Sequence, residues 1–144
     1  MPTGYDLLEH SHEFRMHIMR RVAAGLIDVL VIFLPVVLFI YLFDLEPKEI
    51  LAGVFSGFIW FIYSTLIELR TGATLGKKVL GLIVTSTGEP MTLSKEIVRN
   101  VPKMFWYVLL PVDIFVGLAV NEDPRQRWTD NIVGAVVIKN EKRK

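Results

Sequence analysis

Long apolar stretches separated by short charged segments dominate this chain of 144 residues. Val22 to Phe43 is a run of 22 residues with one charge, Asp28, and Ile50 to Ile67 is a run of 18 with none. The hydrocarbon core of a bilayer, about 30 Å thick, is crossed by roughly 20 helical residues. Both runs therefore predict membrane-spanning helices. The alternative is a pair of buried helices in a soluble bundle, but a chain this short has too few other residues to cover them.

A third apolar segment, Pro102 to Val120, differs from the first two because it contains Lys103 and Asp113. Leu110-Pro111 lies in the middle of this segment, where a proline kinks or breaks a helix. We therefore expect a kinked or re-entrant segment rather than a straight crossing. A full crossing is the alternative, and it would place the basic end of the chain on the opposite side of the membrane.

Two short runs rich in β-branched residues flank the third segment, Lys78 to Ser86 and Ile132 to Ile138. The first is followed by a turn signal, Thr87-Gly88-Glu89-Pro90. Both runs are too short to span a bilayer, and they predict a small sheet at the membrane surface. The predicted fold is thus an all-α polytopic membrane protein with two clear transmembrane helices, a third kinked or re-entrant segment and a small cytoplasmic β element.

The basic residues predict the orientation of the chain. Three precede the first run, only Lys48 lies in the connector 44–49, and five lie in the loop between the second and third segments. Cytoplasmic loops carry the excess of Lys and Arg. We therefore expect a multi-pass protein of the cell membrane with a cytoplasmic N-terminal segment (1–13), a membrane domain (14–139) and a basic tail (140–144), which is cytoplasmic if the third segment is re-entrant.

Composition excludes several classes of function. With 16 basic and 15 acidic residues, the net charge of +1 gives no reason to expect a nucleic-acid partner, and the absence of cysteine excludes disulfides and thiol chemistry. The segment Gly72 to Lys78 resembles a phosphate loop but has three intervening residues instead of four. All three histidines precede residue 18 and lack the spacing of a zinc site. The sequence therefore predicts no catalytic residue, no metal, no cofactor and no enzymatic activity.

Each predicted helix carries one polar stripe. Charged residues inside membrane segments cost about 2.5–3.5 kcal/mol each, so they usually face a partner or a wet cavity. Arg21 and Asp28 lie two turns apart on the first helix, and Glu68 ends a stripe that contains Gly53 and Gly57 on the second. On the third segment the stripe comprises Arg99, Lys103, Trp106, Leu110, Asp113 and Gly117. These charges either pair to lock the helices together or form an ion or substrate site.

Three blocks of sequence resemble the RDD family of membrane proteins, which is named for one arginine and two aspartates. They are Arg20-Arg21-Val-Ala-Ala-Gly-Leu-Ile-Asp28, Thr74-Leu-Gly76-Lys77-Lys78-Val-Leu-Gly81-Leu-Ile-Val84 and Asp130-Asn-Ile-Val-Gly134-Ala-Val-Val137. The blocks occur in the order of the family and extend over roughly residues 14 to 139. The resemblance implies that Arg21, Asp28 and Asp130 are the residues of the family motif.

The resemblance implies a transport component for an unidentified ligand, in some members an exchanger of sodium for protons. For such a function, Asp28, Asp113 and Glu68 are the candidate ion or substrate site. Arg21 and Asp130, with Arg99, are the candidates for structural charge pairing. The alternative function is a non-transporting membrane scaffold or accessory protein in which all these charges are paired. We expect the partners to be the lipid bilayer, further copies of the chain, which would pack through Gly53 and Gly57, and, for an exchanger, monovalent cations and protons.

Overall fold

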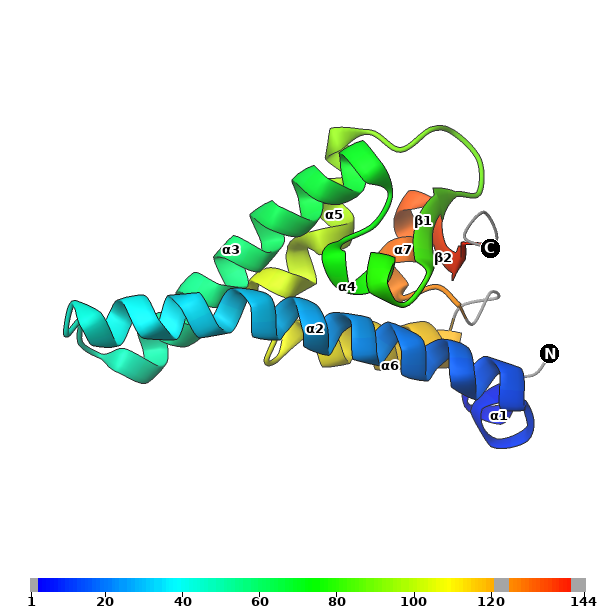
Figure 1. Cartoon of the computed structure of the whole chain (residues 1–144). Coiled ribbons are helices and arrows are strands. Elements are labelled where there is room, and N and C mark those ends of the chain that lie inside the picture. The colour runs from blue at the N-terminus through cyan, green and yellow to red at the C-terminus, as the bar shows by residue number, and fades with distance from the viewer. Residues whose placement is uncertain (1–2, 121–124, 141–144) are drawn as a thin grey trace.

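The computed structural model of the chain describes residues 3–120 and 125–140. Within these residues the chain forms helices and one two-stranded sheet (Figure 1). The elements are α1 (Gly4–His10), α2 (His12–Leu42), α3 (Lys48–Thr71), α4 (Leu75–Val79), β1 (Leu82–Ser86), α5 (Leu93–Met104), α6 (Leu109–Val120), α7 (Trp128–Val133) and β2 (Ala135–Lys139).

Helices α2 and α3 contain the two apolar runs, and both are long and apolar enough to cross a membrane. At 1.5 Å per residue, the 31 residues of α2 extend about 46 Å. The two helices pack antiparallel at the connector, around a core of buried residues: Ile32, Val36, Ile40, Ala52 and Trp60. The outward faces of both helices remain apolar and exposed, as a lipid environment requires. The prediction of a polytopic helical membrane fold is confirmed.

The third segment is two helices, α5 and α6, bent by 115° relative to each other. The break lies at residues 105–108, before Leu110-Pro111, so the predicted position of the break was wrong. Pro111 lies in the first turn of α6, where a backbone N–H has no partner within the helix and a proline is tolerated. The predicted stripe from Arg99 to Gly117 is consequently divided between two helices.

The bent pair returns to the end of the molecule at which it begins. Arg99 in the middle of α5 contacts Asp130 of α7, and Ser94 at the start of α5 lines a hollow together with Ile132 of α7. A Cβ on Gly117, near the end of α6, would lie 2.8 Å from the Cα of Arg127, next to α7. Because both outer ends adjoin α7, the pair forms a hairpin whose turn points toward the middle of α2 and α3 (Figure 1), and we expect this hairpin to be re-entrant.

The two predicted β runs pair in an antiparallel sheet, with Leu82 opposite Lys139 and Ser86 opposite Ala135. The strands are shorter than the runs, because Lys78 and Val79 belong to α4 and the first two residues of the second run belong to α7. Gly81 and Gly134 introduce the strands with positive φ angles of 68° and 69°, which glycine adopts at low cost. The sheet packs against Ala24 of α2.

The glycine face of α3 is occupied within the chain. A Cβ on Gly57 would overlap the backbone carbonyl of Met104, and a Cβ on Gly53 would lie 3.8 Å from the ring of Tyr107. The small residues therefore admit the end of α5 and the turn after it. This face is not free for the second copy of the chain that we expected there, and the expected oligomer stays a prediction that needs another surface.

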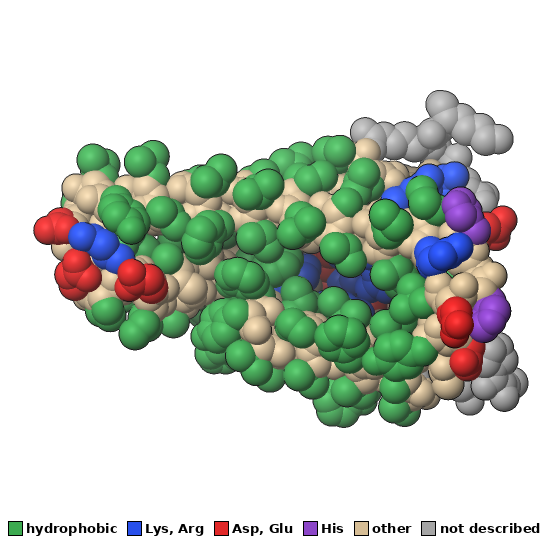
Figure 2. Space-filling model, turned by 90° about the horizontal axis from the view of Figure 1, so that it is seen from below, with side chains coloured by type: hydrophobic (Ala, Val, Ile, Leu, Met, Phe, Trp, Pro, Cys, Tyr) green, Lys and Arg blue, Asp and Glu red, His purple; other side chains and the backbone are tan. Residues whose placement is uncertain are grey.

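Charge is concentrated at the two ends of the molecule, with an apolar band between them (Figure 2). The α2–α3 connector lies at one end; α1, α4, the sheet and α7 lie at the other (Figure 1). We expect the connector outside the cell and the opposite end in the cytoplasm. The predicted basic tail falls largely on residues 141–144, outside the described residues.

Cysteine labelling tests this orientation cleanly because the native chain has no cysteine. In intact cells an impermeant thiol reagent should label Glu46→Cys in the connector. It should leave Gly88→Cys after β1 and Lys139→Cys at the end of β2 unlabelled until the cells are permeabilised. Labelling of Lys139→Cys in intact cells would contradict the re-entrant arrangement, and labelling of Gly88→Cys alone with no labelling of Glu46→Cys would reverse the orientation.

Candidate functional site

Glu68, in the last turns of α3, is the centre of a buried charge network. Its carboxylate accepts hydrogen bonds from Lys77 Nζ and Arg99 Nη1, and from Asn100 Nδ2 at 3.3 Å. Lys103 Nζ lies 3.8 Å from the same carboxylate. The side chains of Glu68 and Arg99 are completely buried. A fully buried carboxylate is stable only with such compensation, and here three cations from α4 and α5 supply it.

Asp130 forms the second carboxylate of the network and is surrounded by arginines. Its Oδ1 lies 2.6 Å from Arg99 Nε, and its Oδ2 lies 3.2 Å from Arg21 Nη2. The backbone N–H of Arg127 also donates to Oδ2, at 3.1 Å. Burial alone raises the pKa of Asp130, but Arg99, Arg127 and Arg21 outweigh it and hold the pKa well below its usual range. Asp130 is therefore an ionised structural anchor for α7.

Lys77 connects α4 to this network. Burial lowers the pKa of Lys77 to about 8, although the nearby carboxylate of Glu68 opposes that change. This ammonium group is thus the member of the network, outside the membrane-spanning segments, that titrates nearest to neutral pH.

Asp28 is separate from the arginine network. Its Oδ2 accepts a hydrogen bond of 2.6 Å from Thr74 Oγ1, and its Oδ1 accepts one of 2.9 Å from the backbone N–H of Gly76. A Cβ on Gly76 would overlap the carbonyl of Ala24, so only glycine allows α4 to approach α2 this closely. The carboxylate that we expected to contribute to an ion or substrate site therefore holds α4 against α2.

Asp113 holds α6 against α7. It accepts hydrogen bonds of 2.8 Å from both the backbone N–H and the Oγ1 of Thr129, and it lies 3.4 Å from Arg127 Nη1. We expected Asp113 to contribute to an ion or substrate site. Its contacts are instead with α7 and the residue before it.

The structure thus distributes the candidate residues over three places. Arg21, Arg99 and Asp130 lie in one network with Glu68, Asp113 joins the edge of this network through Arg127, and Asp28 has other partners. Sequence reasoning did not include Thr74, Lys77, Glu96 and Arg127 among the candidate site residues. The signal for Thr74 and Lys77 was present in the T-x-G-K block.

A cavity of about 280 Å³ lies beside the network, bounded by α2, α5 and α6. Figure 2 shows a hollow with basic atoms at its floor and apolar side chains around it. Asp28 is the only carboxylate residue that lines the cavity, within the described part of the chain. The basic residues that line it are Arg21, Lys77, Arg99, Lys103 and Arg127.

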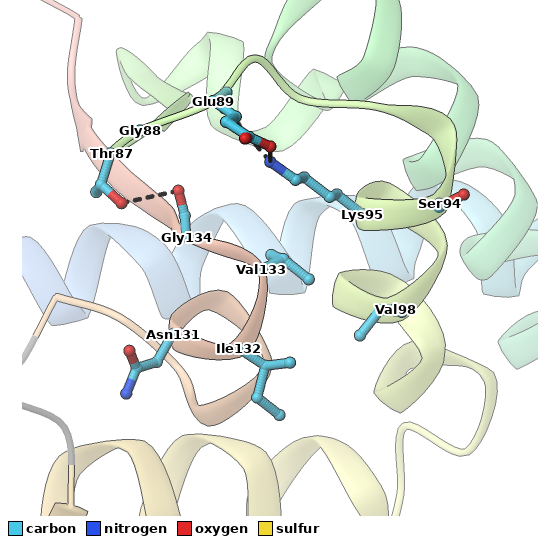
Figure 3. A pocket seen from close by; sticks show the side chains of 10 residues that line it. All are labelled: Thr87, Gly88, Glu89, Ser94, Lys95, Val98, Asn131, Ile132, Val133 and Gly134. Carbon is cyan, nitrogen blue, oxygen red and sulfur yellow. Dashed lines mark hydrogen bonds and ion pairs between the residues drawn. The ribbon is translucent and has the colours of Figure 1, made fainter.

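A second, shallower hollow lies at the end of the molecule opposite the α2–α3 connector, between the β1–α5 loop, α5 and α7 (Figure 3). Lys95 Nζ lies 3.8 Å from Glu89, and Thr87 Oγ1 donates to the carbonyl of Gly134 at 2.9 Å. These groups are exposed and satisfy one another, so this hollow offers a ligand less than the buried cavity does. Within residues 3–120 and 125–140, no three histidine or carboxylate side chains converge as metal ligands.

The sequence model of the RDD family matches residues 15–134, which is most of the chain. The chain belongs to the RDD family. No curated protein and no solved structure matches this RDD protein. Family membership and the apolar helices together make it an integral membrane protein. The family's three residues have distinct partners here, since Arg21 and Asp130 meet at 3.2 Å and Asp28 binds α4.

Proposed function

We propose that this RDD protein is a non-enzymatic transport component of the cell membrane whose ligand occupies the cavity between α2 and α6. The cavity carries the proposal. It combines five basic residues with an apolar wall, next to helices that span the membrane. A protein that served only as a scaffold would have no use for an open hollow of this kind with basic residues at its floor.

The charge of the lining favours an anionic ligand. The carboxylates of Glu68 and Asp130 approach the arginines from the network side, and Asp28 is the only carboxylate residue among the described lining residues. Arg99 Nη2 is buried without a hydrogen-bond partner in the described part of the chain. A buried donor of this kind favours an anionic acceptor.

The second candidate function is the exchange of monovalent cations for protons, in which Asp28 would bind the cation or the proton. The observation in its favour is that Asp28 lines the cavity. Against it, both carboxylate oxygens already accept hydrogen bonds, from Thr74 and Gly76. A cation would have to compete with these donors in a cavity with five basic side chains.

Transport assays in proteoliposomes distinguish an anionic ligand from the exchange of monovalent cations for protons. We expect a fluorescent anionic lipid analogue to cross the bilayer faster with the protein than without it, as measured by dithionite reduction of the outer-leaflet dye. Proton flux driven by sodium or potassium gradients, measured with an entrapped pH dye, should stay at the protein-free level. The two probes separate an anionic ligand from a cation, because each responds to one form only.

Asp28→Asn provides the decisive variant, because it keeps the shape of the side chain and removes its charge. Cation-driven proton flux in the native protein that Asp28→Asn abolishes would establish exchange and overturn the anionic form. Absence of both fluxes would overturn lipid transport and cation exchange alike and would favour the scaffold alternative.

A further inference from the structure

We propose that the anionic ligand is a phospholipid of the surrounding membrane, which enters the cavity laterally and places its phosphate beside Arg99 and Lys103. This inference rests on the proposed function, because it names the ligand of the same cavity. Three independent features of the cavity lead to it: where it opens, how deep it extends, and which donors it leaves unused.

The cavity opens on the lipid-facing surface of the molecule. Val22 and Leu26 of α2 line it, and both side chains are more than half exposed. They belong to the apolar face that a membrane protein presents to acyl chains. A ligand that arrives through this opening comes from the bilayer, which favours a lipid over a dissolved ion as the occupant.

The depth of the cavity matches the boundary between headgroups and acyl chains. Its α2 lining extends from Ile18 to Val29, which is about 16 Å along the helix at 1.5 Å per residue. Arg21 directly precedes the apolar run that begins at Val22. A phospholipid whose phosphate lies near this level directs its acyl chains toward the apolar residues deeper in the cavity, among them Leu110 and Ile114.

The walls of the cavity provide donors for a phosphate. Arg99 Nη2 and Trp60 Nε1 are buried without hydrogen-bond partners within the described residues. Lys103 Nζ lies 5.5 Å from the centroid of the Trp60 ring and 3.8 Å from Glu68, a carboxylate that Lys77 and Arg99 also neutralise. Phosphate oxygens accept hydrogen bonds from guanidinium and ammonium groups.

The volume fits part of a lipid rather than the whole molecule. About 280 Å³ equals roughly nine waters at 30 Å³ each. This space holds a phosphate group and the first methylenes of one chain. The rest of the lipid would lie on the exposed apolar surface of α2 and α6, which includes Leu26, Leu30, Val112 and Phe115.

Tryptophan fluorescence tests the inference directly, since Trp60 and Trp106 line the cavity. The third tryptophan, Trp128, is half-exposed, and Trp128→Phe removes its signal. The full chain with this change is reconstituted into phosphatidylcholine vesicles. These contain an equal fraction of either brominated phosphatidylglycerol or brominated phosphatidylcholine. We expect stronger quenching by the brominated phosphatidylglycerol, because a lipid that occupies the cavity brings bromine close to both rings.

Two variants and one control test whether the preferential quenching by phosphatidylglycerol arises in the cavity. Lys103→Gln should weaken the phosphatidylglycerol preference about fivefold, the factor that corresponds to about 1 kcal/mol per basic residue at an anionic lipid. Gly25→Leu should remove the preference by filling the cavity, because Gly25 lines it and a Cβ there meets nothing within 4 Å. It also tests the site if Lys103→Gln does not fold. Lys48→Gln, at the opposite end of the molecule, removes a charge from outside the cavity and should have no effect.

Equal quenching by the two brominated lipids would overturn the inference. So would equal losses in Lys103→Gln and Lys48→Gln, which would indicate a general surface charge effect. Relief of quenching by added inorganic phosphate would show that the cavity binds a soluble anion instead. Because the assay measures binding and not movement, preferential quenching without lipid flux supports the lipid site and overturns transport. Lipid flux without preferential quenching would support transport and overturn the lipid site in the cavity.

Discussion

Replacing Glu68 with glutamine is expected to lower the free energy of unfolding by about 3–5 kcal/mol, the usual cost of removing one partner from a buried ion pair. Glutamine retains the size of the side chain but removes the negative charge that Lys77, Arg99 and Lys103 share. Its amide group would also present donors to cations that need acceptors. Unfolding of the purified protein by SDS in mixed micelles, followed by circular dichroism, measures the change.

Glu89→Gln is the matched control for this experiment. The Glu89 side chain is 91% exposed, and its contact with Lys95 is 3.8 Å, so its loss should change stability by less than about 1 kcal/mol. Similar losses of stability in the two variants would show that Glu68 does not compensate the buried cations.

The second large effect concerns Arg21 and Asp130, which a double-mutant cycle should show to be coupled. Asp130→Asn should cost about 3–5 kcal/mol, because it removes the carboxylate shared by three arginines. Arg21→Gln should cost less, since the Arg21 side chain is 14% exposed and water replaces part of its contact. The double variant should be more stable than the sum of the single losses predicts, by about 0.5–3 kcal/mol.

A charge swap is the wrong test for this pair. An arginine at position 130 would face Arg99 and Arg127, so the exchange should remain destabilising even though Arg21 and Asp130 meet. Arg20→Gln provides the control, because the neighbouring Arg20 side chain is only half-buried and forms no ion pair that the structure records among residues 3–120 and 125–140. Strict additivity of Arg21→Gln and Asp130→Asn would contradict the contact.

The sequence was sufficient to predict the membrane-spanning helices and the sheet, because each of them is specified by a continuous run of residues. An uncharged run such as Ile50 to Ile67 is compatible with few structures other than a membrane helix. The position of the break was not predictable, because Pro111 breaks a helix in its interior but is accommodated in a first turn. Whether Pro111 breaks a helix or is accommodated therefore depends on where the helix begins. Packing of the α5–α6 turn against Gly57, and of α6 against α7, determines where α6 begins.

The candidate site required information that helical periodicity does not contain. A stripe analysis places Glu68 and Arg99 on inward faces but cannot assign them to each other. It also treats Asp28 as isolated, because its partners Thr74 and Gly76 lie in a short segment outside the long helices. Lys77 was part of the second family block and of an incomplete phosphate loop, but neither pattern assigns it a partner. The T-x-G-K block instead supplies one hydroxyl and one N–H to Asp28 and an ammonium to Glu68.

The re-entrant hairpin also has a consequence for biosynthesis. Each charge at the middle of a helix that leaves the translocon costs about 2.5–3.5 kcal/mol. The hairpin carries several, and they are Lys95, Glu96, Arg99, Lys103 and Asp113. Asp130, Arg127 and Thr129, which compensate Arg99 and Asp113, are synthesised after the hairpin. We therefore expect α2 and α3 to integrate as the ribosome releases them, whereas α5 and α6 wait at the cytoplasmic surface and dock only once α7 has been translated.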